Sequence, residues 1–240
     1  MRGIVYINGY LNKKKFTYTG IEFYEFMRGL KKPIENILLL QGNYVGNEYI
    51  NHFELIRGKS EVEKLIKEDV YNYGNFCFVD YKPGTVEQMT KQEIAELLYL
   101  SHMYIPMNSP FFDVIENRFA YLAHDDGYFA KLYCRNINDF SDVLGDKIYQ
   151  YVLSKDKRRI TELDVNIKQR LLELTEEALL IDLETIEYSK NKLKIEIFLL
   201  RENRIEYDMD MVFNFYEKNK RNAACRGYLI FEDGAWEIAL

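Results

Sequence analysis

The chain has 240 residues, of which 48% are hydrophobic, 15% aromatic and 29% charged, and its formal net charge is −6. This composition excludes a disordered chain, because many apolar residues combine with a small net charge. The acidic balance argues against a protein that coats nucleic acid, since that affinity comes mainly from Lys and Arg on phosphates. The charge is also uneven, with a net +4 in residues 1–60 and a net −6 in residues 161–240.

No targeting or membrane segment is expected. Asn8 and Gly9 interrupt the apolar start of the chain, so no secretory signal forms. The longest apolar runs are short, whereas a membrane span needs about 20 residues. Cys77, Cys134 and Cys225 are widely spaced, which favours reduced, packed thiols over a metal or redox site. We therefore expect a soluble, cytoplasmic protein without a membrane partner.

The first 60 residues predict strands and one helix. Short β-branched or aromatic runs indicate strands at residues 4–7, 37–40 and 53–56. Between them, the pair Thr19/Glu22 has the spacing of a capping box, in which each side chain satisfies a backbone N–H at a helix start. This helix is expected to end before Pro33.

Residues 60–152 predict three more helices and a hairpin. Capping boxes at Ser60/Glu63 and Thr90/Glu93 start two helices, and a strand over 76–81 lies between them. Asp126-Gly127 is a strong two-residue turn between strands at 117–123 and 128–135. A helix over about 139–152 follows.

The last part of the chain predicts one helix and then strands. The weaker pair Thr161/Asp164 starts a helix over about 163–182, and strands follow at 192–200, 207–216, 227–231 and 235–239. The polar run 154–159 is the best boundary. We thus predict an α+β fold with a mixed sheet and about four helices in the N-terminal part, followed by a helix and an antiparallel C-terminal sheet. The expected domains are 1–155 and 160–240.

The predicted hairpin brings a histidine close to two carboxylates. The expected cross-strand pairs include His124/Phe129 and Leu122/Lys131. A His beside carboxylates can act as a general base, so the candidate catalytic residues are His124, Asp125 and Asp126. Arg118 or Lys131 would assist them. The alternative is that both aspartates only form the turn and His124 pairs across the strands.

Other site motifs are incomplete. Arg57-Gly58-Lys59-Ser60 follows a strand and opens a helix, but a phosphate-binding loop needs Gly at the position of Phe53. What remains is an anion contact at a helix N-terminus. The three histidines lie 50 and 22 residues apart, which is not a zinc pattern. We therefore expect no metal and no cofactor.

Two segments rich in Tyr, Asn and Gly are typical of protein-binding loops. They cover residues 42–51 and 71–75, and their candidate partner-binding residues are Tyr44, Tyr49, Tyr71 and Tyr73. Tyr offers a large contact area at low entropic cost, while Asn and Gly adapt to a partner. The alternative is that these are ordinary turns with half-buried tyrosines.

Part of the chain resembles a known group of proteins. The resemblance covers about residues 76–150 and includes Phe78-Val79-Asp80-Tyr81, residues 92–102, Ser109-Pro110-Phe111-Phe112 and residues 117–127. The group consists of small uncharacterised soluble proteins from Bacillus-type bacteria, some of which carry an oxalate:formate antiporter label. That label implies many membrane spans, and we reject it because the sequence predicts none. The resemblance implies no activity and only that residues 76–150 form one structural unit.

These observations support two hypotheses. The first is a binding protein, such as a regulator, antitoxin or immunity-type inhibitor, whose acidic and Tyr-rich surface engages a protein partner. The second is a small hydrolase or transferase with acid–base chemistry at His124, Asp125 and Asp126. The first is preferred, because the sequence lacks a convergent catalytic motif.

Overall fold

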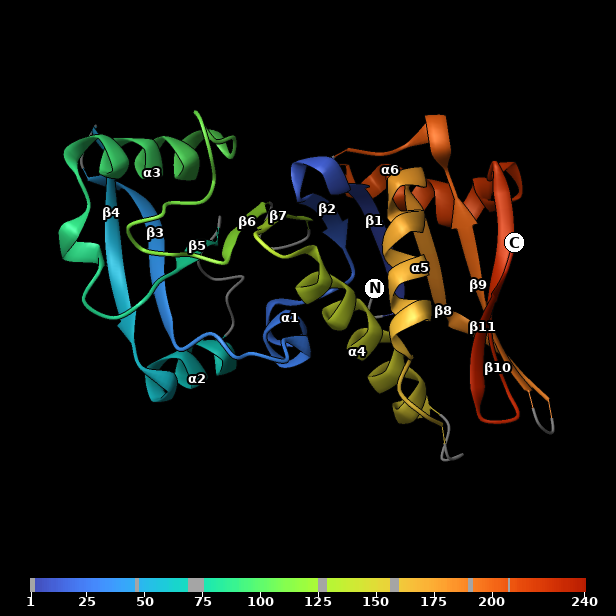
Figure 1. Ribbon diagram of the computed structural model, residues 1–240. Helices are drawn as coiled ribbons and strands as arrows, with labels where there is room; N and C mark the ends of the chain where they lie inside the picture. Colours follow the sequence, from blue (N-terminus) through green and yellow to red (C-terminus); the bar gives the residue numbers. More distant parts are fainter. Residues whose placement is uncertain are drawn as a thin grey trace. The chain divides into compact units, whose positions relative to one another are not determined.

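The structure is a computed structural model that describes residues 3–45, 48–68, 76–124, 129–155, 160–189, 192–206 and 208–240 (Figure 1). Within these ranges the side chains of residues 41–45, 48–51, 124, 209, 219 and 221 are outside the description. The chain forms two compact units. Unit 1 contains Met1–Lys31 and Ile137–Leu240, and unit 2 contains Lys32–Asn136.

Unit 1 contains antiparallel strands in the order β11-β10-β9-β8-β1-β2. Their bounds are Ile4–Tyr10 for β1, Lys15–Thr19 for β2, Leu179–Tyr188 for β8, Lys192–Leu199 for β9, Cys225–Glu232 for β10 and Ala235–Ala239 for β11. The first strand of the chain therefore lies inside the sheet, between β8 and β2. Its β-branched and aromatic residues are buried, as expected for a strand covered on both faces.

The helices of unit 1 are α1 (Phe23–Gly29), α4 (Ile137–Lys155), α5 (Val165–Leu174) and α6 (Met209–Asn214). In Figure 1, α4 and α5 lie together on one face of the sheet, where the ring of Phe140 stacks on that of Phe16 at 4.2 Å. On the opposite face, the hydroxyl of Tyr6 donates to the carbonyl of Ile205 at 2.9 Å. The segment around α6 thus covers the second face.

Unit 2 contains antiparallel strands in the order β7-β6-β5-β3-β4. The strands are Asn36–Val45 (β3), Glu48–Arg57 (β4), Cys77–Asp80 (β5), Phe119–His124 (β6) and Phe129–Cys134 (β7). The helices are α2 (Lys59–Lys67) and α3 (Lys91–Met103), which lie toward opposite ends of β3 and β4 in Figure 1.

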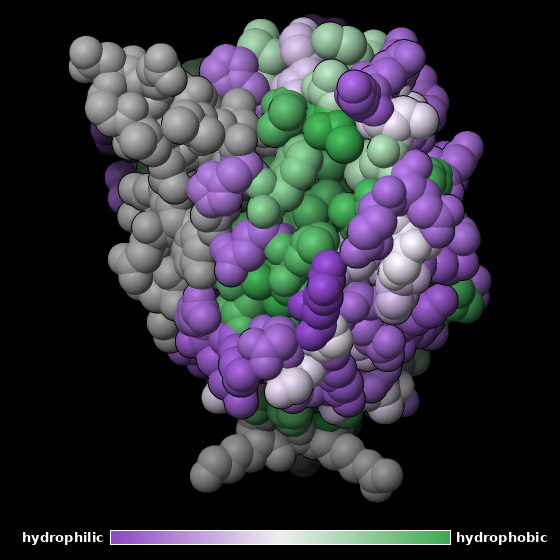
Figure 2. All heavy atoms as spheres, turned by 90° about the vertical axis from the view of Figure 1, so that its left-hand side faces the viewer, coloured by the Kyte–Doolittle hydropathy of each residue, from purple (hydrophilic) through white to green (hydrophobic). Residues whose placement is uncertain are grey.

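A hydrophobic cluster joins α3 to the sheet of unit 2. Leu97 and Leu100 of α3 belong to one buried cluster with Leu38, Val79 and Leu122 from three strands. Partly buried residues pack against this cluster, namely Phe53, Leu55, Val86, Met89, Tyr104, Phe111 and Val114. Figure 2 views the side on which β4 lies in Figure 1 and shows a band of hydrophobic side chains between hydrophilic ones. The core of unit 2 therefore reaches the surface on this side.

The predicted fold class is wrong. All described strand pairs are antiparallel, so the N-terminal part does not form a mixed sheet. The helices are not gathered in the N-terminal part, and β1 pairs with β8 from the C-terminal half. The sequence predicted β1 itself, but a buried apolar run does not indicate which strand it will pair with. The predicted domains 1–155 and 160–240 stay a prediction.

Two local predictions in the C-terminal half were also wrong. The helix expected to reach residue 182 ends at Leu174, and Leu179 already belongs to β8. The strand expected at 207–216 contains α6, whose N-terminal N–H at Met211 is capped by the carboxylate of Asp208 at 2.9 Å. Val212 and Phe215, three residues apart, are both buried. The buried residues therefore have helical spacing, whereas the strand was predicted from the alternation of Met209, Met211, Phe213 and Phe215.

All three cysteines are free, and the packing that the sequence predicted for them is confirmed for Cys77 and Cys134 but not for Cys225. Burial raises the pKa of the Cys77 thiol to about 12, and Cys134 is fully buried, whereas Cys225 is partly exposed. Because the thiolate is the reactive form, we expect one fast-reacting thiol per native chain in a DTNB assay at pH 8 and three after denaturation. Cys225→Ser should remove the fast phase. Two or more fast thiols in the native protein would contradict the packing described for β5 and β7.

In the described part of the chain, every helix is too short or too polar to span a membrane.

Candidate functional site

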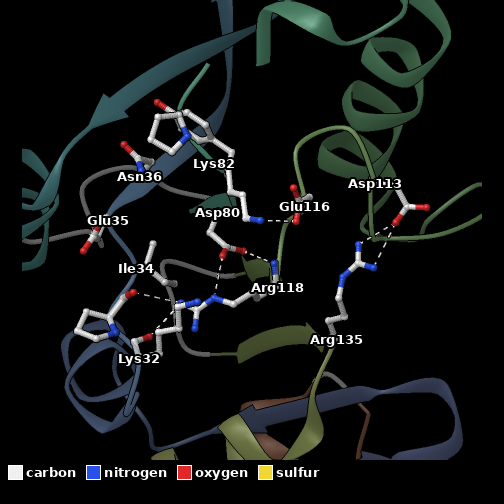
Figure 3. A pocket seen from close by; sticks show the side chains of 13 residues that line it. Lys32, Ile34, Glu35, Asn36, Asp80, Lys82, Asp113, Glu116, Arg118 and Arg135 are labelled. Atoms are coloured by element: carbon white, nitrogen blue, oxygen red, sulfur yellow. Dashed lines mark hydrogen bonds and ion pairs between the residues drawn. The ribbon is translucent and has the colours of Figure 1, made fainter. Parts of the chain in front are cut away.

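A cavity of about 690 Å³ opens at one end of the sheet in unit 2 (Figure 3). Because the strands are antiparallel, the start of β3, the end of β5, the start of β6 and the end of β7 all lie at this end. The lining includes four basic and four acidic side chains, namely Lys32, Lys82, Arg118, Arg135, Glu35, Asp80, Asp113 and Glu116. We call this cavity the Arg118 cleft.

Asp80 is the buried anchor of the Arg118 cleft. It is the last residue of β5, and only 7% of its surface is exposed. Its Oδ1 accepts from the backbone N–H groups of Arg118 at 2.8 Å and Phe119 at 2.7 Å, and its Oδ2 accepts from Nε of Arg118 at 3.3 Å. One carboxylate thus holds both the backbone and the side chain at the start of β6.

The far end of the Arg118 guanidinium is held by backbone carbonyls. Its Nη2 donates to the carbonyl of Lys32 at 3.0 Å and to that of Pro33 at 3.3 Å. Figure 3 shows the guanidinium between Asp80 and this backbone. The planar Arg fork is therefore fixed before any ligand arrives, which reduces the entropy that binding would cost.

The loop before β6 is fixed by a fully buried asparagine. Asn117 accepts from the N–H of Phe112 at 2.7 Å through Oδ1 and donates through Nδ2 to the carbonyls of Pro110 and Phe119, at 2.9 and 3.0 Å. All of its side-chain hydrogen bonds are to backbone groups. These bonds satisfy backbone N–H and C=O groups of the loop 110–119, because buried polar groups need hydrogen-bond partners. The fixed loop places Asp113 and Glu116 at the rim of the cleft.

Two further ion pairs lie at the rim. Lys82 pairs with Glu116, and Nη1 of Arg135 lies 3.2 Å from Oδ1 of Asp113. The carboxylates are exposed, by 54% for Glu116 and 95% for Asp113. Exposed pairs of this kind contribute about 0–1 kcal/mol each. A ligand carboxylate can therefore replace either acidic partner at little cost.

The electrostatics of Asp80 reflect two opposing effects. Burial raises its pKa, while the N–H of Phe119 and the charge of Arg118 act in the other direction. The lining residues named above combine one half-buried, oriented guanidinium with three exposed cations. Chemically, such an arrangement can bind a carboxylate through charge-assisted hydrogen bonds.

The predicted catalytic residues cannot be placed. Asp125 and Asp126 lie outside the described residues, as does the side chain of His124. The hairpin register is confirmed, because His124 pairs with Phe129 and Leu122 with Lys131. The face of the hairpin that carries Lys131 and Tyr133 is buried. Tyr133 belongs to the hydrophobic cluster under α3, and Lys131 is only 5% exposed.

The residues expected to assist His124 have other partners. Arg118 is held by Asp80, and Nζ of Lys131 donates to the carbonyl of Tyr104 at 2.7 Å. The Tyr104 residue is the left-handed C-cap of α3, so Lys131 also neutralises the carbonyl end of that helix. Asp80 was missed as a site residue. Its signal in the sequence is a carboxylate directly after the apolar run Cys77–Val79.

The predicted partner-binding tyrosines also lie outside the description. Tyr71 and Tyr73 are not described, and neither are the side chains of Tyr44 and Tyr49. The backbones of Tyr44 and Tyr49 are opposite each other in β3 and β4. Their role in binding stays a prediction.

The motif at Gly58 has a structural role. Gly58 precedes α2 with φ 81°, and its N–H donates to Oδ1 of Asn36 at 3.0 Å. Only glycine adopts this conformation readily. Among the described residues, no group of three or more His, Cys, Asp and Glu side chains is arranged to hold a metal ion.

Comparison with known proteins adds no name to this site. No protein-family description, no curated protein and no solved structure matches the chain.

Proposed function

We propose that the protein is a binding protein, and that the Arg118 cleft receives a carboxylate-bearing segment of a protein partner. The observation that carries this proposal is the arrangement of cations around Arg118. Asp80 and two backbone carbonyls orient the half-buried guanidinium, and Lys82 and Arg135 flank it in pairs with exposed carboxylates.

A protein segment suits this arrangement because its side-chain carboxylates can exchange with Glu116 and Asp113. Each exchange replaces one ion pair by another, so Lys82 and Arg135 stay paired while the displaced carboxylate of Glu116 or Asp113 turns to solvent. The Arg118 guanidinium contributes geometric specificity, since its planar fork matches a carboxylate. The cleft would therefore select an acidic residue within a partner segment.

The predicted Tyr surface is the second part of this proposal. Tyr44, Tyr49, Tyr71 and Tyr73 would add contact area to a partner that the cleft recognises by charge. A cytoplasmic location and the likeness to Bacillus-type proteins also stay proposals, and they fit a regulator or an immunity-type inhibitor.

Peptide display tests the cleft directly. From a library of random nonapeptides, the wild-type protein should enrich sequences with Asp or Glu at one fixed position. The double variant Lys82→Gln/Arg135→Gln should bind a selected peptide about 10-fold more weakly in fluorescence anisotropy, a change of about 1.4 kcal/mol.

A matched control separates the cleft from general charge. Lys64 and Arg57 form exposed pairs with Glu61 and Glu87 on the same unit, and neither basic residue lines the cleft. Lys64→Gln/Arg57→Gln changes the net charge equally and should leave the affinity within about 2-fold. Equal losses in both double variants, or no acidic preference in the library, would refute the proposal.

A further inference from the structure

A second polar cavity, also of about 690 Å³, lies in unit 1. It is lined by strands β9 and β10 and by the segment after α6. Arg226 of β10 is directly opposite Phe198 of β9. Glu196 lies two residues before Phe198 and shares its face of the sheet. The other charged residues of the lining are Glu217, Lys218 and Lys220.

Lys220 is positioned by a fully buried carboxylate. Asp182 has no exposed surface and accepts from the N–H groups of Glu184 and Thr185 at 3.0 and 3.1 Å and from Oγ1 of Thr185 at 2.6 Å. Nζ of Lys220 lies 2.9 Å from its Oδ2. A buried carboxylate needs such a partner, so the ammonium is held at the wall of the cavity.

Aromatic rings support the same ammonium group. Nζ of Lys220 lies 4.3 Å from the ring centre of Tyr216 and 5.8 Å from that of Phe198. Both distances fall within the range of cation–π attraction. Strands β8 and β9 and the helical segment after α6 thus fix one cation at the cavity.

The basic lining residues offer more donors than their partners use. Asp182 accepts one of the three ammonium protons of Lys220, and Glu196 pairs with one arm of the Arg226 guanidinium, which has five N–H groups. Lys218 donates to Oδ1 of Asn214 at 3.2 Å. The excess of N–H donors favours an oxyanion, and Lys together with Arg is the usual combination for phosphate.

The acidic lining residues restrict the rest of the ligand. Glu196 and Glu217 would repel a second anionic group, but their carboxylate oxygens accept hydrogen bonds from hydroxyl groups. A cavity of this size fits a small organic molecule. We propose that this cavity binds the phosphate ester of a small polyhydroxy compound, with the phosphate on Lys220 and Arg226 and the hydroxyls on Glu217 and Glu196.

Calorimetric titration with ribose 5-phosphate, inorganic phosphate and ribose tests this proposal at low ionic strength. We expect ribose 5-phosphate to bind more tightly than inorganic phosphate, and ribose alone to give no measurable heat at 10 mM. Arg226→Gln should weaken the binding of both phosphate compounds by about 10-fold or more. Glu217→Gln should weaken the binding of ribose 5-phosphate only.

The matched control is Arg170→Gln, which removes an exposed arginine of the same unit that pairs with Glu173. It should leave both affinities within about 2-fold. The proposal is overturned if ribose 5-phosphate gives no heat at 10 mM, if Arg226→Gln behaves like Arg170→Gln, or if Glu217→Gln does not distinguish the two phosphate compounds. Circular dichroism of each variant shows whether it is folded before it is titrated.

Discussion

Replacement of Lys147 by Met is expected to lower the free energy of unfolding by about 3–5 kcal/mol. Nζ of Lys147 lies 2.8 and 2.7 Å from the two carboxylate oxygens of Glu25, and the side chains are only 3% and 10% exposed. Without the ammonium group, the carboxylate of Glu25 stays buried without compensation. Urea unfolding followed by far-UV circular dichroism measures the change.

A second substitution separates the buried charge from the packing of the Lys147 side chain. Glu25 also forms the capping box of α1 with Glu22, and Gln at this position keeps that hydrogen bond. Glu25→Gln/Lys147→Met should therefore recover more than half of the stability that Lys147→Met loses. Lys64→Met, in an exposed pair with Glu61, should change stability by about 0.5 kcal/mol or less. A double variant as unstable as Lys147→Met would contradict the role given to the charge.

Replacement of Asp80 by Ala is the second large expected effect, with a loss of about 3–5 kcal/mol. The variant leaves the backbone N–H groups of Arg118 and Phe119 without their acceptor and removes the carboxylate that orients the guanidinium. Buried donors without partners cost the full desolvation of each group. Peptide binding in the Arg118 cleft should be lost as well. Urea unfolding and fluorescence anisotropy measure the two effects.

Two control variants test whether the charge and the burial of Asp80 cause this loss. Asp80→Asn keeps one oxygen for the backbone donors and should lose less stability than Asp80→Ala. Asp113→Ala removes a carboxylate that is 95% exposed and should change stability by about 0.5 kcal/mol or less. If Asp80→Ala is within about 1 kcal/mol of the wild-type protein, Asp80 does not anchor the cleft.

Local signals in the sequence predicted several elements correctly. The Thr90/Glu93 capping box is present at the start of α3, and the strands predicted at 227–231 and 235–239 lie in β10 and β11, with Asp233-Gly234 between them. Both depend on groups within four residues of each other. The capping box predicted at Thr19/Glu22 is displaced, because Glu22 itself is the N-cap of α1 and pairs with Glu25. Neighbouring polar residues can offer the same cap, and only the packing of the helix selects among them.

The candidate site depended on contacts that no local signal reveals. Asp80 and Arg118 are 38 residues apart, and their pairing follows from the adjacency of β5 and β6. Asp182 and Lys220 are also 38 residues apart and meet because the segment around α6 crosses one face of the sheet. Each residue alone is a charged side chain that could equally lie in solvent.

The sequence by itself determined the positions of most strands and helices, the hairpin register at His124 and the burial of Cys77 and Cys134. These features follow from turn residues, capping groups and apolar periodicity over a few residues. Only the tertiary structure decided that β1 lies between β2 and β8, that residues 209–214 form a helix and that the buried carboxylates Asp80 and Asp182 hold Arg118 and Lys220. The physical reason is that strand partners and buried ion pairs depend on the burial of whole faces, which residues far apart in the chain determine together.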